Sequence, residues 1–137
     1  MLEERNKSDM AAIREKVHLY AATCNAGDFE GWISIWTDDA IQMYPGVPSR
    51  VGKEQIRAGM KPAFDQFILN IALTSDIEVK VSGDLGFACG TYLLSMTPKA
   101  GGDTIEFDGK YLSIFERQGD GSWKGTHDCF NSNKPET

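Results

Sequence analysis

The sequence predicts a single α+β domain, with helices in the first half of the chain and an antiparallel sheet in the second half. In the first half, apolar residues recur at three- and four-residue steps, which is typical of amphipathic helices. In the second half, apolar and polar residues alternate, which is typical of half-buried strands. The segments between these strands are too short for crossover helices, so hairpins and antiparallel pairing are expected.

The first predicted helix runs from Asp9 to Asn25, and Ser8 or Asp9 can cap its start. Its apolar stripe consists of Met10, Ile13, Val17, Tyr20 and Cys24. The charged residues 14–16 lie off this stripe and are expected to face water. Gly27 suits the left-handed position that follows the last turn of a helix.

Two shorter helices are expected next. Asp28 can cap a helix that runs through Trp36, and a third helix should extend from Lys53 to about Phe67. Pro62 should kink or shorten this third helix, because proline lacks the amide hydrogen that the helix needs. The apolar stripe of the third helix consists of Ile56, Met60, Phe64 and Phe67.

Five strands are predicted, and turns rich in glycine, aspartate and proline separate the later ones. They are Ala40–Tyr44, Ile77–Val81, Leu85–Met96, Thr104–Arg117 and Trp123–Asn131. A chain of 137 residues is the size of one domain. Residues 1–137 are therefore expected to form one domain with an ordered core at about residues 9–131, and the polar tail from Asn133 should fray.

The composition excludes several classes of partner. The net charge of −6 arises from 14 Lys and Arg against 20 Asp and Glu, so neither nucleic acid nor an anionic membrane is an expected partner. The first nine residues are polar and do not fit a signal peptide, and no apolar run is long enough to span a membrane. A cytoplasmic location is expected.

The cysteines and histidines do not form a metal-binding pattern. Cys24, Cys89 and Cys129 are far apart in the sequence, which fits free thiols in a reducing compartment. His18 and His127 show no spacing typical of zinc ligands. The sequence also lacks a glycine-rich phosphate loop, so neither a metal nor a cofactor is expected.

Three segments resemble known proteins. Tyr20–Gly31 (YAATCNAGDFEG) and Trp36–Ala40 (WTDDA) resemble the opening of the ketosteroid-isomerase and SnoaL-like families of the nuclear transport factor 2-like superfamily. Phe115–Lys124 is similar to the penultimate hairpin of these families. The resemblance implies a cone-shaped, cystatin-like roll, in which three N-terminal helices pack on a curved mixed or antiparallel sheet that encloses an apolar pocket.

The resemblance also suggests site residues in the first half of the chain. Tyr20 occupies the place of the tyrosine that donates a hydrogen bond to the developing oxyanion in ketosteroid isomerases; the alternative is an aromatic of the helix stripe with its hydroxyl bonded elsewhere. Tyr44 replaces the aspartate that serves as the base before a proline. Because an unperturbed tyrosine with a pKa of about 10 accepts protons poorly, steroid double-bond isomerisation is not expected. Asp108 and Tyr111 are the nearest candidates for the second oxyanion donor of that family.

The last strand supplies the remaining catalytic candidates. Strict alternation groups Thr126, Asp128 and Phe130 on one face, and His127 and Cys129 with Trp123 on the other. Similarity to the family places Asp128 in the cavity beside Tyr20, with a raised pKa, as a base or a protonated donor. The alternative is a structural hydrogen bond, and a slip of one residue would turn His127 inward instead. The candidate ligand-binding residues are Trp36, Tyr44, Met60, Phe64, Thr126 and Phe130.

Members of these families include isomerases, cyclases, dehydratases, epoxide hydrolases and proteins without catalysis. Because most of these classes are enzymes, the first function that the resemblance implies is a cofactor-independent enzyme that acts on a small apolar carbonyl or polyketide-like compound. The alternatives are a non-catalytic binding module for a small apolar ligand and an association domain. A homodimer is also expected through apolar residues assigned to the outer face of the sheet. These residues are Tyr92, Leu94, Met96, Leu112 and Ile114.

Overall fold

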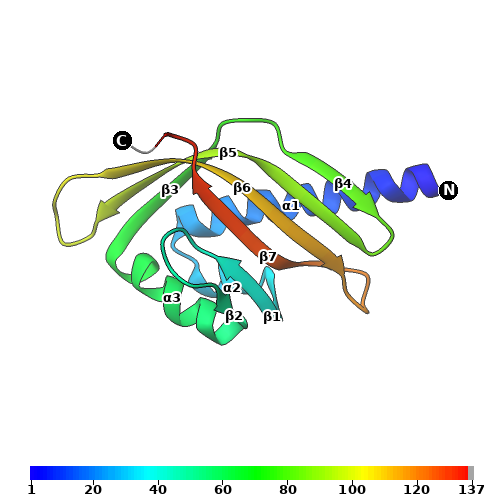
Figure 1. Cartoon of the computed structure of the whole chain (residues 1–137), viewed down its shortest axis with the longest axis horizontal. Coiled ribbons are helices and arrows are strands. Elements are labelled where there is room, and N and C mark those ends of the chain that lie inside the picture. The colour runs from blue at the N-terminus through cyan, green and yellow to red at the C-terminus, as the bar shows by residue number, and fades with distance from the viewer. Residues whose placement is uncertain (136–137) are drawn as a thin grey trace.

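A curved sheet wraps around one long helix in the computed structural model, which describes residues 1–135 (Figure 1). The α+β prediction is confirmed. The helices are α1 (Leu2–Ala26), α2 (Phe29–Ile33) and α3 (Lys53–Gln66). The strands are β1 (Trp36–Met43), β2 (Arg50–Val51), β3 (Phe67–Leu73), β4 (Glu78–Ser82), β5 (Leu85–Pro98), β6 (Ile105–Arg117) and β7 (Trp123–Ser132). The tail expected to fray extends to residues 136–137, which lie outside the described residues.

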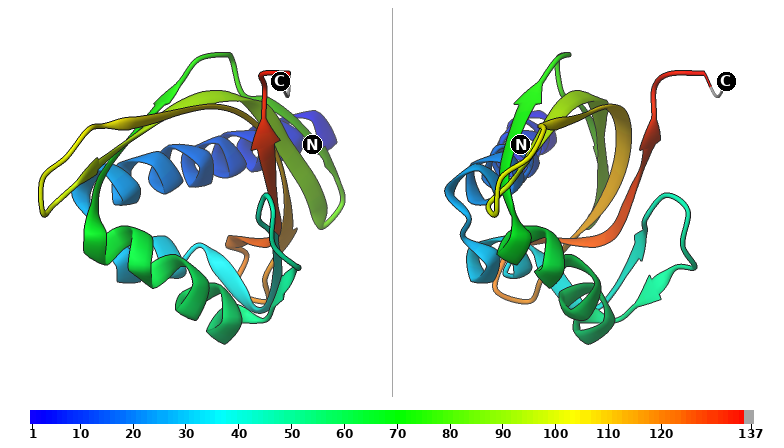
Figure 2. Two further views of the ribbon diagram at one scale, coloured as in Figure 1. Left: turned by 60° about the vertical axis from the view of Figure 1, so that its left-hand side comes forward. Right: turned by 90° about the vertical axis from the view of Figure 1, so that its left-hand side faces the viewer.

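The sheet has seven strands in the order β2-β1-β7-β6-β5-β3, with β4 also paired to β5. Strands β1 and β7 run parallel, and the other described pairs are antiparallel. Figure 2 shows α1 along the concave side of the sheet, with α3 across its open end. This arrangement leaves a space between α1, α3 and the concave face, where the candidate site lies.

Helix α1 begins at Leu2, seven residues before the predicted start. The predicted cap at Ser8 or Asp9 is wrong, because both residues lie inside the helix. Asp9 is only 6% exposed, and its carboxylate accepts hydrogen bonds from the Arg117 guanidinium and, at 3.4 Å, from the Trp123 indole. The carboxylate is therefore part of a contact between α1 and the β6–β7 hairpin.

The junction between α1 and α2 depends on three polar or small residues. Gly27 adopts φ 68° after the last turn of α1, where it satisfies helix carbonyls. Asp28 caps α2 as predicted, accepting a hydrogen bond from the Gly31 amide at 3.0 Å. The Asn25 side chain accepts a hydrogen bond from the Ile71 amide at 2.6 Å and donates one to the Ile71 carbonyl at 3.2 Å. Asn25 thereby acts as a strand partner for the edge of β3.

Asn25→Ala should lower the free energy of unfolding by about 1–2 kcal/mol, because it leaves two backbone groups of β3 without a partner. Chemical denaturation would measure the loss. Asn70→Ala, on the exposed face of the same strand, is the matched control and should have little effect. An equal loss in the two variants would contradict this role of Asn25.

Helix α2 ends at Ile33, and Trp36 begins β1 instead of ending the helix. The Gly125 amide of β7 donates a hydrogen bond to the Ile35 carbonyl at 2.8 Å, which draws the chain into the sheet. The Trp36 ring lies directly against Gly125, where a side chain on Gly125 would clash with it. Pairing with a strand distant in sequence therefore overrides the helical spacing of the tryptophans.

Helix α3 continues to Gln66 with Pro62 inside it, so this proline does not shorten the helix. Strand β3, which begins directly after α3 at Phe67, was not predicted from the sequence. Its pairing with β5 extends from Phe67–Pro98 to Leu73–Tyr92. Within residues 1–135, no helix is sufficiently long and apolar to cross a membrane.

Candidate active site

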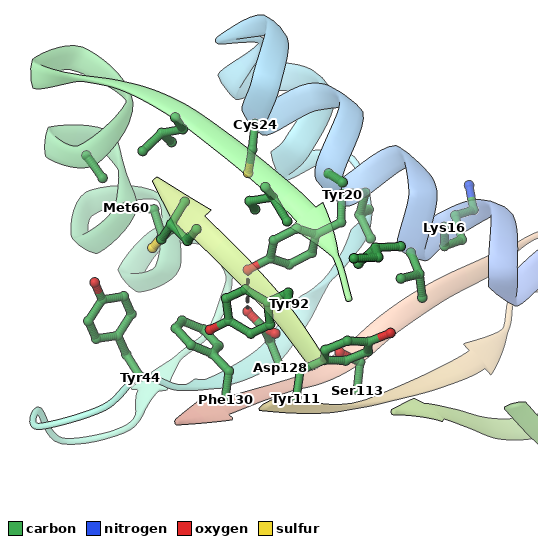
Figure 3. Close-up of a pocket in the computed structure, with 18 of the residues that line it drawn as sticks. Lys16, Tyr20, Cys24, Tyr44, Met60, Tyr92, Tyr111, Ser113, Asp128 and Phe130 are labelled. Carbon is green, nitrogen blue, oxygen red and sulfur yellow. Dashed lines mark hydrogen bonds between the residues drawn. The ribbon is translucent and has the colours of Figure 1, made fainter. Parts of the chain in front are cut away.

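A cavity of about 90 Å³ lies between α1, α3 and the concave face of the sheet (Figure 3). Most of its lining is aliphatic or aromatic. The lining side chains that carry a hydroxyl, thiol, carboxylate or ammonium group are Lys16, Tyr20, Cys24, Tyr44, Tyr92, Tyr111, Ser113 and Asp128. An apolar cavity with few polar groups is typical of a small-molecule site.

Asp128 is the buried carboxylate of this cavity, with 2% of its surface exposed. It lies on β7, opposite Ser113 of β6 and beside Gln42 of β1. Its Oδ2 atom accepts hydrogen bonds from Gln42 Nε2 at 3.2 Å and from the Tyr20 hydroxyl at 3.4 Å. Burial raises the pKa of Asp128 to about 6, although these two hydrogen bonds act in the opposite direction. The carboxyl group can therefore both accept and donate a proton near neutral pH.

Tyr20 projects from α1 toward Asp128, as the dashed line in Figure 3 shows. Its ring packs edge-on against Trp32 and Trp36, at centroid distances of 5.5 and 6.0 Å. Burial and the nearby Asp128 raise the pKa of Tyr20 well above its usual value. The phenol is therefore neutral at pH 7 and remains a hydrogen-bond donor held by aromatic packing.

Besides Tyr20, the phenols of Tyr44, Tyr92 and Tyr111 line the cavity. Burial raises the pKa of Tyr111 to about 12, while burial and Asp128 raise that of Tyr92. A Cβ atom on Gly109 would overlap the Tyr92 ring, and one on Gly90 would lie 2.9 Å from the Tyr111 hydroxyl. Tyr92 was predicted to lie on the outer face of the sheet, not in the site. The glycines inside β5 and β6 were the available signal, since a glycine in a strand often marks a close approach.

A bulge in β7 changes which side chains face inward. The pairing with β6 shifts between Ile114–His127 and Phe115–Gly125, so Thr126 is left in the bulge. Its hydroxyl donates a hydrogen bond to the Ile114 carbonyl at 3.3 Å and does not line the cavity. Because the bulge inserts one residue, Trp123 faces the core, although strict alternation placed it with His127.

The structure places only some of the sequence-predicted residues in the lining. Those in the lining are Tyr20, Tyr44, Met60, Asp128, Phe130 and the oxyanion candidate Tyr111. Trp36 and Phe64 instead belong to the aromatic core, where both pack against Trp32. His127 pairs with Ile41 and Ile114 on the opposite face of β7, and Asp108 lies on that same outer face of β6. The structure therefore corrects the assignment of Trp36, Phe64, Thr126, His127 and Asp108 to the pocket.

Predictions about side-chain direction were met in part for one residue and were wrong for three others. Lys16, expected to face water, lines the cavity, but Figure 3 shows its ammonium pointing away from the other labelled side chains. Tyr92, Leu94 and Met96 line the cavity instead of the outer face of the sheet. Of the predicted dimer residues, Leu112 and Ile114 do lie on the outer face.

Gln42 and Arg50 extend the hydrogen-bond network of Asp128 away from the cavity. Gln42 is fully buried on β1, and its Oε1 atom accepts a hydrogen bond from Arg50 Nη1 at 2.8 Å. The Arg50 guanidinium lies 4.5 Å from the centre of the Tyr44 ring.

Among residues 1–135, no cluster of three His, Cys, Asp or Glu side chains could hold a metal ion.

Several solved structures share this fold. A ketosteroid isomerase-like protein from Erwinia carotovora atroseptica has a TM-score of 0.79 and 24% sequence identity, over 93% of this chain and 98% of that chain. A conserved protein from Planctomyces limnophilus has a TM-score of 0.81 and 25% identity, over 90% and 94% of the two chains. A nuclear transport factor 2-like superfamily protein from Salmonella enterica serovar Typhimurium has a TM-score of 0.86 at 13% identity, over 96% and 95%.

Sequence comparison identifies the family. No curated protein matches the sequence of this chain. The sequence pattern of the SnoaL-like domain, however, matches residues 5–127, from the first turns of α1 to the middle of β7. The matched segment contains both Tyr20 and Gln42 and ends one residue before Asp128. The chain therefore belongs to the SnoaL-like domain family.

Proposed function

We propose that this protein is a cofactor-independent enzyme that transfers a proton within a small apolar carbonyl compound. The observation that carries the proposal is the buried carboxyl group of Asp128, hydrogen-bonded to the half-buried Tyr20 in a largely apolar cavity. A carboxyl group with a pKa of about 6 suits general acid–base catalysis near neutral pH. The name of the ketosteroid isomerase-like protein from Erwinia is consistent with such chemistry.

The proposed reaction uses Asp128 as the base and Tyr20 as the oxyanion donor. Asp128 takes a proton from the carbon next to the carbonyl group. The electrons of the C–H bond form a carbon–carbon double bond, and the π electrons of the carbonyl group move to its oxygen. The Tyr20 hydroxyl, which is only 3.4 Å from Asp128, turns to donate a hydrogen bond to that oxygen. The oxyanion then re-forms the carbonyl group, and protonated Asp128 returns the proton to carbon; in a β-hydroxy ketone, the enolate electrons instead break the C–O bond at the β-carbon, and Asp128 protonates the departing hydroxyl group, which leaves as water.

The size of the cavity limits the substrate. A cavity of about 90 Å³ admits a compact ligand, and the flexible side chains of Met60 and Met96 in its wall can adjust to a larger one. Tyr44 occupies the place that carries the base in ketosteroid isomerases, so the proposed base acts from β7 instead. We therefore propose small ketones, enones and β-hydroxy ketones as the substrate class.

Deuterium exchange tests the proposal without knowledge of the product. A panel of these compounds is incubated with the protein in D₂O, and mass spectrometry measures deuterium at the carbon next to the carbonyl group. We expect exchange whose rate rises with pH through about pH 6 and then levels off, because the ionised carboxylate accepts the proton. If no compound exchanges faster than in buffer alone, the proposal of an enzyme for this substrate class is contradicted.

A non-catalytic binding module remains the second candidate, because the same apolar cavity could hold a metabolite without converting it. Native mass spectrometry of the purified protein distinguishes the two. A bound small molecule that is released unchanged, and that still binds the Asp128→Asn variant, would favour the binding module over the enzyme.

We also propose a homodimer that forms through the outer face of the sheet. Leu85 and Leu112 are 52% and 46% exposed on this face of β5 and β6, and Met43 is 44% exposed on β1. Leu112→Glu should convert a dimer into a monomer in sedimentation at micromolar concentration, because the charge would be buried. Val47→Glu, in the exposed loop after β1, is the control. A wild-type monomer would contradict the proposal.

A further inference from the structure

A chain of hydrogen bonds connects Asp128 to a cation outside the cavity. Arg50 Nη1 donates to Gln42 Oε1 at 2.8 Å, and Gln42 Nε2 donates to Asp128 Oδ2 at 3.2 Å. Gln42 is fully buried between the two charged groups. The buried amide of Gln42 therefore links the guanidinium group of Arg50 to the carboxyl group of Asp128 in the cavity.

The side chain of Arg50 packs against two other parts of the fold. Arg50 lies on the short strand β2, with its guanidinium over the Tyr44 ring. The side chain also lies against Gly59 in the middle of α3, where an added Cβ atom would overlap the guanidinium group. Within residues 1–135, no Asp or Glu forms an ion pair with Arg50. Its charge is therefore directed toward Gln42 and the Tyr44 ring.

The guanidinium group determines which way the amide of Gln42 points. Arginine donates hydrogen bonds and cannot accept them, so it selects the Oε1 atom of Gln42. The amide nitrogen must then face Asp128, where it donates to Oδ2 together with the Tyr20 hydroxyl. Among the described residues, no hydrogen bond is made to the other oxygen, Oδ1. The two oxygens of Asp128 are therefore not equivalent.

We infer that Arg50 is a positioning residue, which acts through Gln42 to keep Oδ2 of Asp128 an acceptor and to leave Oδ1 as the oxygen that exchanges protons with the ligand. The catalytic meaning of this inference rests on the proposed function. The hydrogen-bond chain itself is a property of the protein without ligand. It can therefore be tested whether or not a substrate is found.

The other groups that face Asp128 cannot replace Arg50. They are Tyr20 and Cys24 from α1, Tyr92 from β5 and Ser113 from β6. Burial raises the pKa values of the first three, so all of them are neutral at pH 7. Without Arg50, the amide of Gln42 can turn its oxygen toward Asp128, and this arrangement favours a protonated carboxyl group that donates the hydrogen bond.

The test is an NMR titration of the Asp128 side-chain carboxyl carbon, assigned with the Asp128→Asn variant. In Arg50→Met, the pKa of Asp128 should rise by about one pH unit, because a hydrogen bond to the charged form is lost. Arg57→Met removes a positive charge from α3 that pairs with Glu30, and it should leave the pKa of Asp128 unchanged. Equal shifts in the two arginine variants, or no shift in Arg50→Met, would overturn the inference.

Two further variants separate orientation from charge. Gly59→Ala displaces the Arg50 guanidinium without removing its charge and favours the helix, so it should raise the pKa of Asp128 in a folded protein. In a Gln42→Met background, Arg50→Met should add no further shift, because the connection is already broken. If the pKa shifts caused by Gln42→Met and Arg50→Met add, Arg50 acts by its charge alone, and its action through Gln42 is overturned. If Arg50→Met shifts the pKa of Asp128 but no compound exchanges deuterium, the proposed function is refuted, while the action of Arg50 through Gln42 is supported.

Discussion

Asp128→Asn should lower the rate of deuterium exchange by about 10²- to 10⁴-fold, because an amide cannot accept the proton that the carboxylate takes. Asparagine has nearly the same shape as aspartate and can still accept hydrogen bonds from Gln42 and Tyr20. The apolar wall of the cavity is therefore preserved. The measurement is the initial exchange rate at pH 7 on a compound for which wild-type exchange has been established.

Two matched variants sharpen this prediction. Tyr20→Phe keeps the packing against the tryptophans but removes the oxyanion donor, so exchange should fall by about 10²-fold or more. His127→Gln changes a side chain on the opposite face of β7 and should leave the rate unchanged. Full activity of Asp128→Asn, or loss of activity in His127→Gln alone, would show that the wrong side chain of β7 was chosen.

Asp128→Asn should also raise the free energy of unfolding at pH 8. A folded-state pKa raised from 3.8 to about 6 means that the carboxyl group contributes stability below about pH 4, and that this contribution is lost as the pH rises through about 6. The shift is about two pH units, each worth about 1.4 kcal/mol, so the variant should gain up to about 3 kcal/mol at pH 8.

Chemical denaturation of both proteins between pH 4 and pH 8 checks this result. The difference in the free energy of unfolding should be small at pH 4, grow between pH 4 and pH 7, and then level off. A difference that does not change over this range would mean that the pKa of Asp128 is not raised. Such a trade of stability for reactivity is common at active sites.

Asp9→Ala should lower the free energy of unfolding by about 2 kcal/mol, which is a typical contribution of hydrogen bonds to charged groups. The Asp9 carboxylate accepts two hydrogen bonds from Arg117 and one from the Trp123 indole. Its loss would leave the indole and the guanidinium group, which lies over the same ring, without their buried partner. Thermal and chemical denaturation at pH 7 would measure the loss.

Asp84→Asn is the control, because Asp84 also binds Arg117, at 2.9 Å, but its side chain is exposed. A much smaller loss is expected there. The hydrogen bond from Arg117 holds the pKa of Asp9 below its usual value, so the stability that Asp9 provides is present above about pH 4 and is lost as the pH falls. Equal losses in the two variants would show that burial of Asp9 adds nothing.

Local patterns in the sequence located the three helices and five of the seven strands, but not all of their ends. The apolar stripe of α1, the cap at Asp28 and the position of Gly27 follow from short-range rules, and the structure contains all three. The start of α1 could not be predicted, because the carboxylate of Asp9 suits a cap equally well. Its actual partner, Arg117, is 108 residues away in the sequence.

The candidate site was predictable where alternation is regular and not where it breaks. Asp128 and Phe130 follow the bulge of β7, so family resemblance placed them on the correct face. Thr126 lies inside the bulge, and no local pattern marks it. Gln42 and Arg50 carry no motif, and their importance depends on a parallel pairing of β1 with β7 that the sequence does not indicate.

The position of β7 between β1 and β6 also has a consequence for folding. The contacts that build the site join Asp128 to Tyr20 and Gln42 across 108 and 86 residues. Such long-range contacts form late, after the cost of closing large loops has been met. During synthesis, α1 and the first strands leave the ribosome well before β7, with the concave face still open. We therefore expect the cavity and its reactive carboxyl group to form late in folding, when β7 inserts between β1 and β6.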